Sequence, residues 1–207
     1  EWKPSSKNKL KTKLNLNKKN PVLTLFPGSR KDEIKKHIHI FIQSALKAKQ
    51  QINNLQIVIG CAPNMNINDF YKIPKDIFIE NKNPRLALEC SDFAILASGT
   101  ATIEASIFNV PAVIIYKSSW LSWLLAKFFI NTPFIGMSNI IANKEIMPEF
   151  VQHKAKPLDI SNEIIKMHNN INYYKNIVKE LSLISKKLGT PGASKKTAKL
   201  ILKEDNE

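Results

Sequence analysis

Short apolar runs alternate along this chain with longer helical patterns, and this alternation restricts the fold more than any other feature. The runs lie at residues 22–26, 55–60, 76–80, 93–97 and 112–116. Strands that alternate with helices are typical of βαβ units with a parallel sheet. Strands that are almost continuously apolar are typical of a sheet covered on both faces. We therefore predict an α/β fold in which helices flank a parallel sheet.

The 207 residues of the chain suffice for one domain with short appendages. Residues 1–20 contain seven lysines and one acidic residue, and we predict a basic linker there. The sheet domain is predicted over residues 21–188, and its last part has a helical pattern. The sequence GTPG at 189–192 interrupts that pattern, so we predict a separate helical extension over residues 189–207.

The chain has a formal net charge of +14, but this charge is weak support for nucleic-acid binding. All but two of its 31 basic residues are lysines, the exceptions being Arg30 and Arg85. Together with frequent Ile and Asn, this bias is typical of AT-rich coding. A positive field attracts anions of several kinds, and the sequence contains no motif that reads DNA or RNA. We predict no nucleic-acid partner and keep a basic nucleic-acid-binding module as the alternative.

The sequence predicts no metal site. Cys61 and Cys90 lie in no CxxC motif and in no His/Cys cluster with zinc spacing, which favours two reduced, buried thiols. His37 and His39 are two residues apart on a predicted helix and so point to different sides. The first 20 residues lack the apolar core of a signal peptide, and no run reaches the ~18 apolar residues of a transmembrane helix. These features predict a cytosolic protein.

The first candidate site is residues 27–34 (PGSRKDEI), which follow an apolar run and begin a helical pattern. Gly28 permits a tight turn, and Ser29 is suited to the N-cap of the helix. Open α/β sheets bind anions where a helix begins beside the carboxyl end of a strand. Arg30 stands in a lysine-rich chain, which indicates that its planar guanidinium matters, and this group suits a phosphate. An ordinary capped helix with an exposed arginine is the alternative.

The second candidate site, residues 97–104 (ASGTATIE), repeats this arrangement after a later run. Ser98 and Thr100 offer hydroxyls, the amides of Gly99 and Thr100 can point at a phosphate, and Glu104 could accept two ribose hydroxyls. The alternative is a helix that begins with small residues and carries a solvated Glu104. Both loops belong to one edge of the sheet, so both helix N-termini can face one crevice, which suits a diphosphate. Neither loop matches GxGxxG or GxxxxGK[ST].

Two further segments leave alternatives open. Asn139, Glu149 and Gln152 carry amide or carboxylate groups that could bind a base or a sugar, or that could serve as helix caps and solvated side chains. Residues 119–130 (SWLSWLLAKFFI) are strongly apolar and too short to span a bilayer. This segment is either a buried helix or a helix partly exposed at a membrane interface.

Three segments together resemble the lipid-A-disaccharide synthase family, which are glycosyltransferases of the GT-B type. They are LFPGSRKDEI (25–34), SDFAILASGTATIEASIFNVPAVIIYK (91–117) and MSNIIANKEIMPEFVQ (137–152). One departure is MSN in place of the LPN often found before the asparagine. The family joins two Rossmann-like domains across a cleft. The resemblance implies that this chain is the C-terminal, UDP-binding half, a Rossmann-like sheet domain followed by C-terminal helices.

The resemblance also implies an activity and its site. The family transfers 2,3-diacylglucosamine from its UDP donor to 2,3-diacylglucosamine 1-phosphate, giving lipid A disaccharide 1-phosphate and UDP, with no metal or other cofactor. The catalytic base is expected in the N-terminal domain and not in this chain. The implied substrate-binding residues here are Gly28, Ser29, Arg30, Ser98, Gly99 and Thr100 at the diphosphate, Glu104 at the ribose, and Asn139, Glu149 and Gln152 in the donor pocket.

The implied partners are the two acylated substrates, the N-terminal half of the same enzyme, the inner-membrane surface and a possible homodimer. The implied location is cytoplasmic and peripheral, on the inner membrane, with Trp120, Trp123 and Phe128 in contact with lipid. One rival is another GT-B enzyme such as a UDP-sugar epimerase, which needs additional catalytic acids. The second rival, a basic nucleic-acid-binding module, predicts binding that weakens with salt and shows no nucleotide specificity.

Overall fold

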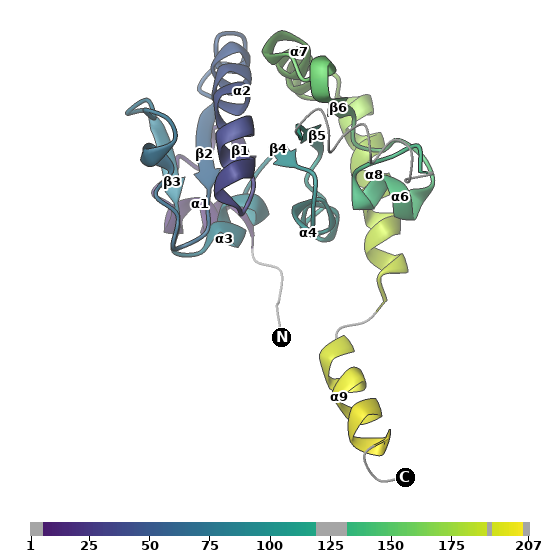
Figure 1. Ribbon diagram of the computed structural model, residues 1–207. Helices are drawn as coiled ribbons and strands as arrows, with labels where there is room; N and C mark the ends of the chain where they lie inside the picture. Colours follow the sequence, from purple (N-terminus) through teal and green to yellow (C-terminus); the bar gives the residue numbers. More distant parts are fainter. Residues whose placement is uncertain (1–5, 119–131, 190–191, 205–207) are drawn as a thin grey trace.

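Six parallel strands form one sheet in the order β3-β2-β1-β4-β5-β6 (Figure 1). The computed structural model describes residues 6–118, 132–189 and 192–204. This strand order is that of Rossmann-like folds, which confirms the predicted fold class. The strands are β1 (Val22–Phe26), β2 (Gln56–Gly60), β3 (Ile77–Glu80), β4 (Phe93–Ala97), β5 (Ala112–Tyr116) and β6 (Glu149–Val151).

Helices cover both faces of the sheet, as the apolar strands predict (Figure 1). On one face α2 packs against α7, and on the other lie α3 and α4. The helices are α1 (Lys7–Lys13), α2 (Lys31–Lys49), α3 (Pro84–Glu89), α4 (Ala101–Ile107), α6 (Met137–Ala142), α7 (Pro157–Asn169), α8 (Ile171–Lys187) and α9 (Ala193–Glu204), with short 3-10 turns at Ile67–Asp69 and Gln152–Lys154. Because both faces are covered, every residue of β4 is buried.

The sequence analysis missed β6. This strand is three residues long, lies at the edge of the sheet and is only half-buried. Its backbone pairs with β5, with Phe150 opposite Ile115. Such a short, partly exposed segment has no apolar run, so its sequence carries no strand signal.

The segment predicted as a basic linker packs against the sheet domain from residue 6 onward. Leu10 and Leu16 are buried in a small cluster with Val58 of β2. The Lys11 ammonium is buried as well and lies 3.0 Å from the Asp92 carboxylate. The predicted domain boundaries at residues 20 and 188 remain predictions. Figure 1 shows α9 extending away from the sheet domain.

The predictions for the two cysteines and for the apolar segment 119–130 have different outcomes. Cys61 and Cys90 are free and buried, as predicted, and burial raises the pKa of the Cys90 thiol to about 11. The apolar segment 119–130, with Trp120, Trp123 and Phe128, lies outside the described residues. Among the helices that the structure describes, none has the length and apolar character needed to cross a membrane.

Candidate functional site

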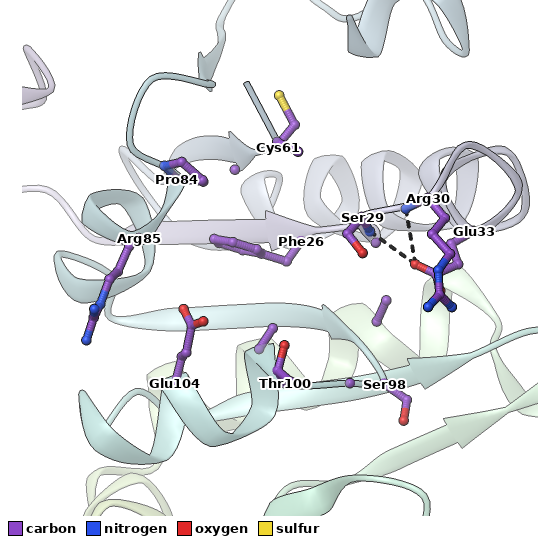
Figure 2. A pocket seen from close by; sticks show the side chains of 16 residues that line it. Phe26, Ser29, Arg30, Glu33, Cys61, Pro84, Arg85, Ser98, Thr100 and Glu104 are labelled. Carbon is purple, nitrogen blue, oxygen red and sulfur yellow. Dashed lines mark hydrogen bonds and ion pairs between the residues drawn. The ribbon is translucent and has the colours of Figure 1, made fainter. Parts of the chain in front are cut away.

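An open cavity of about 500 Å³ lies at the carboxyl ends of β1, β2 and β4 (Figure 2). The strand order reverses between β1 and β4, and crevices at such reversal points are where open α/β sheets bind ligands. Both predicted loops face this cavity. The predicted residues that line it are Gly28, Ser29, Arg30, Ser98, Gly99, Thr100 and Glu104. The structure therefore brings together both of the loops that the sequence singled out.

The loop after β1 is folded around the carboxylate of Glu33, a residue in the first turn of α2. The N-cap of α2 is Arg30, so the prediction of Ser29 as N-cap was wrong. Glu33 Oε2 accepts hydrogen bonds from the Ser29 N–H at 3.0 Å and the Arg30 N–H at 3.4 Å (Figure 2). The carboxylate thus accepts from the N–H of the N-cap residue, as the glutamate of a capping box does, and from the N–H of the residue before it.

Gly28 makes this arrangement possible. Its φ of +127° lies where side chains are strained. A Cβ at this position would also come within 2.7 Å of both Cβ and Oε2 of Glu33. The close approach between the loop and the Glu33 side chain therefore requires glycine at position 28.

The Arg30 guanidinium remains open to ligands. One of its nitrogens, Nη1, lies 3.4 Å from Glu33 Oε1, while the side chain is 83% exposed. An exposed ion pair of this kind is weak, so it leaves the guanidinium able to bind an anion.

The loop after β4 supplies small residues and hydroxyls. Gly99 has a φ of +154°, and a Cβ added there would meet no atom within 4 Å, so the backbone faces open space. The Ser98 hydroxyl donates to the Ile135 carbonyl at 3.0 Å. The Thr100 and Glu104 side chains point into the cavity (Figure 2). Position 104 on α4 thus places a carboxylate one helical turn from the loop.

Arg85 lies beside Glu104, at the end of the cavity opposite Arg30 (Figure 2). Its guanidinium carbon stands 5.2 Å from the centre of the Phe108 ring. The sequence analysis did not include Arg85 in the site, although the rarity of arginine in this chain could have indicated it. Both arginines of a lysine-rich chain line one cavity, so the rarity of arginine that singled out Arg30 applies equally to Arg85.

Asn139 and Glu149 do not line this cavity and are bonded to the fold instead. Asn139 is fully buried, and its Oδ1 accepts from the amides of Ile146 and Met147 at 2.9 and 3.0 Å. Its Nδ2 donates to the Met147 carbonyl at 2.7 Å and to Glu149 Oε1 at 2.8 Å. The Glu149 carboxylate also accepts from the amides of Ile135 and Gly136, at the start of α6.

Gln152 likewise lies outside this cavity. Its Nε2 donates to the Ser118 hydroxyl at 2.9 Å, and its Oε1 accepts from the Ser118 N–H at 3.4 Å. Gln152 has a φ of +52°, in the left-handed region. Its side chain thus connects the chain after β6 to the end of β5.

A smaller cavity of about 260 Å³ adjoins the first and shares Arg30, Glu33 and Ser98 with it. Buried His37 stands in its wall between two backbone segments. Its Nδ1 lies 3.0 Å from the Pro27 carbonyl, and its Nε2 accepts from the Lys117 N–H at 3.0 Å. These partners require a proton on Nδ1 and none on Nε2. Burial lowers the pKa of this imidazole below its ordinary value of 6.5, which favours the same neutral form.

Metal ligands are sparse among the residues that the structure describes. Within them, no group of three or more His, Cys, Asp and Glu side chains is placed to hold a metal ion. The charged groups that line the larger cavity are two guanidinium and two carboxylate groups. Their chemistry suits an anionic ligand that also carries hydroxyls.

Comparison with known sequences gives a family match over most of the chain. A family model described as lipid-A-disaccharide synthetase matches residues 2–202. The chain is 32% identical to lipid-A-disaccharide synthase 1 of Legionella pneumophila (strain Lens), over 96% of this chain and 53% of that protein. It is 31% identical to the lipid-A-disaccharide synthase of Sulfurihydrogenibium sp. (strain YO3AOP1), over 92% and 53%. The chain spans about half the length of these curated relatives.

Solved structures agree on the fold. The chain is similar to Anabaena Alr3699/HepE in complex with UDP-glucose, with a TM-score of 0.61 and 14% identity over 90% of this chain and 49% of that one. It is also similar to WaaG, a glycosyltransferase involved in lipopolysaccharide biosynthesis, with a TM-score of 0.59 and 11% identity over 89% and 48%. At these identities the likeness establishes the fold alone.

Proposed function

The chain belongs to the lipid-A-disaccharide synthetase family, and from this premise we propose that it is the UDP-binding half of a glycosyltransferase of lipid A biosynthesis. The donor is UDP-2,3-diacylglucosamine and the acceptor is 2,3-diacylglucosamine 1-phosphate. The products are lipid A disaccharide 1-phosphate and UDP. The transfer needs no metal or other cofactor.

One observation carries the proposal: both predicted loops and both arginines line a single cavity where the strand order reverses. A volume of about 500 Å³ is within the range of small-ligand sites. Arg30 and the loop at residues 98–100 would hold the diphosphate, and Glu104 would accept the ribose hydroxyls. Asn139, Glu149 and Gln152 would then contribute only by supporting the wall of the donor pocket, in keeping with their bonds to the backbone and to Ser118.

The proposed chemistry is an inverting displacement at the anomeric carbon of the donor sugar. The acceptor hydroxyl attacks this carbon, and a base in the N-terminal half takes its proton. The bond between the anomeric carbon and the β-phosphate oxygen breaks, and negative charge develops on the departing UDP. A guanidinium placed before the reaction stabilises that charge. Because Glu33 already engages the Ser29 and Arg30 amides, the exposed Arg30 side chain is the charged group by which this loop would bind the diphosphate.

Arg30→Ala should weaken UDP binding much more than uridine binding. A hydrogen bond to a charged group contributes ~1.5–3 kcal/mol, so UDP affinity should fall about tenfold or more. Isothermal titration calorimetry with UDP, UMP and uridine measures the difference. The matched control is Lys31→Ala, which removes a neighbouring positive charge that lies outside both cavity walls. An equal loss for UDP and uridine would contradict the assignment of Arg30 to the phosphates.

We also propose that the enzyme acts on the cytoplasmic face of the inner membrane, with Trp120, Trp123 and Phe128 in contact with lipid. The support is an aromatic, apolar segment in a chain of net charge +14, which anionic lipids attract. Replacing Trp120 and Trp123 by serine together should reduce co-sedimentation with anionic liposomes several-fold. Trp2→Ser is the control. Unfolding of the double variant, seen by circular dichroism, would favour a buried helix instead.

The proposed enzyme contains an N-terminal half that closes the cavity from the other side. The relatives extend to about twice the length of this chain, which supports this part of the proposal. A homodimer is a further prediction, and sedimentation equilibrium with the whole enzyme would test it.

A further inference from the structure

We infer that Glu33 and His37 act together as positioning residues for the donor diphosphate, an inference that rests on the proposed function. They lie four residues apart on α2, and residues at this spacing share one face of a helix. Both line the smaller cavity, and both bond to backbone outside their own helix. Together they fix the loop that carries Arg30.

Glu33 fixes the end of the loop next to α2. Its carboxylate accepts from two consecutive amides, those of Ser29 and Arg30, and its other oxygen lies 3.4 Å from the Arg30 guanidinium. Gly28 has no side chain and so lets the loop close around this carboxylate. One side chain therefore determines the path of the backbone at the residue that carries the guanidinium.

His37 fixes the other end of the same loop and joins it to β5. Its Nδ1–H donates to the Pro27 carbonyl, at the exit of β1. Its Nε2 accepts from the Lys117 N–H, directly after β5. Pro27 and Lys117 are ninety residues apart in the sequence, so the imidazole sets the spacing between the exit of β1 and the exit of β5, where Lys117 lines the smaller cavity.

The carboxylate of Glu33 has two effects with opposite signs on an anionic ligand. Its hydrogen bonds hold the loop in place, while its negative charge repels a diphosphate. A glutamine at position 33 keeps a carbonyl oxygen for the amides and removes the charge, whereas an alanine removes both. Comparison of the two variants therefore separates positioning from charge.

Hydrogen exchange of the 207-residue chain, measured by NMR without ligand, tests the geometry. In Glu33→Ala the Ser29 and Arg30 amides should exchange at least about tenfold faster, since each loses a charged acceptor. In His37→Ala the Lys117 amide should exchange faster by a similar factor. Asp32→Ala and His39→Ala are matched controls on the same helix, and their patterns should follow wild type. Unchanged exchange at these amides in the two test variants would overturn the inference, whatever the chain binds.

UDP affinity then tests the role in the site. Glu33→Ala and His37→Ala should each weaken UDP by about tenfold and uridine by much less. Glu33→Gln should stay within about threefold of wild type, because the lost ion pair is exposed and weak. Affinity losses that are equal for UDP and uridine would show a general structural role, and no rescue by glutamine would show that the charge of Glu33 matters and not its bonds to the loop; either result would overturn the inference. If wild type fails to bind UDP while the exchange results hold, the proposed function fails and with it the diphosphate role; the loop geometry stands.

Discussion

Sugar transfer should be undetectable with the 207-residue chain alone and should appear when an N-terminal half from a family member is added. Among described residues that line the larger cavity, Glu33 and Glu104 are the carboxylates. Glu33 already accepts from two amides, and Glu104 is assigned to the ribose. Without the N-terminal half, nothing orients the acceptor opposite the donor or takes the proton from its hydroxyl. The loss of orientation alone reduces a reaction rate by about 10⁵-fold or more.

The measurement is chromatography of acylated products after incubation with both substrates. A thermal shift with UDP on the same preparation serves as the control, because a bound ligand stabilises the fold in proportion to the logarithm of its concentration over the dissociation constant. Rapid turnover by this chain alone would place the base within residues 1–207 and would contradict the proposed division of roles.

Asn139→Ala should lower the free energy of unfolding by about 3–5 kcal/mol, because it leaves several buried polar groups without a partner. Asn139 is fully buried and bonds the amides of Ile146 and Met147, the Met147 carbonyl and the Glu149 carboxylate. Total stabilities of domains are about 5–15 kcal/mol, so this variant should be among the most damaging in the chain. Urea denaturation followed by circular dichroism measures the loss.

The control is Asn53→Ala, which removes an exposed asparagine side chain and should change stability little. The pair of variants also decides between two interpretations of Asn139. Unchanged stability combined with weaker UDP binding would make Asn139 a ligand-contacting residue, as the sequence resemblance implies. A large loss of stability makes it a residue that holds α6 and β6 together.

Five strands were predictable because each is a short apolar run, which burial on both faces favours in β4 and β5 and which the edge strand β3 keeps although Phe78 and Ile79 are exposed. β4 and β5 were predicted with their observed bounds, and β2 and β3 with one extra residue at the start. β6 left no such mark, since its backbone pairs at an edge and its side chains are half-buried. The sequence pattern thus reports which segments are apolar runs, and not which segments form backbone pairs.

The two loops of the site were predictable for a topological reason: the carboxyl ends of parallel strands share one edge. The contacts that shape the loops were not. The bond from Lys117 to His37 spans 80 residues, and no local pattern indicates it. Asn139 shows the converse limit. Its amide could equally bind a sugar or close a buried turn, and only the positions of its neighbours distinguish these roles.

The position of β1 in the middle of the sheet has a consequence during synthesis on the ribosome. Leu23 of β1 pairs with Ile57 of β2 on one side and with Phe93 of β4 on the other. β1 is therefore made before both of its neighbours, and it can pair with β4 only after β2 and β3 have been made. Each of these pairings closes a long loop, and such non-local contacts slow folding. A nascent chain that ends before β4 would expose one edge of β1, four of whose five residues are buried in the folded domain. That edge is the surface on which we expect chaperones, or a second nascent chain, to act.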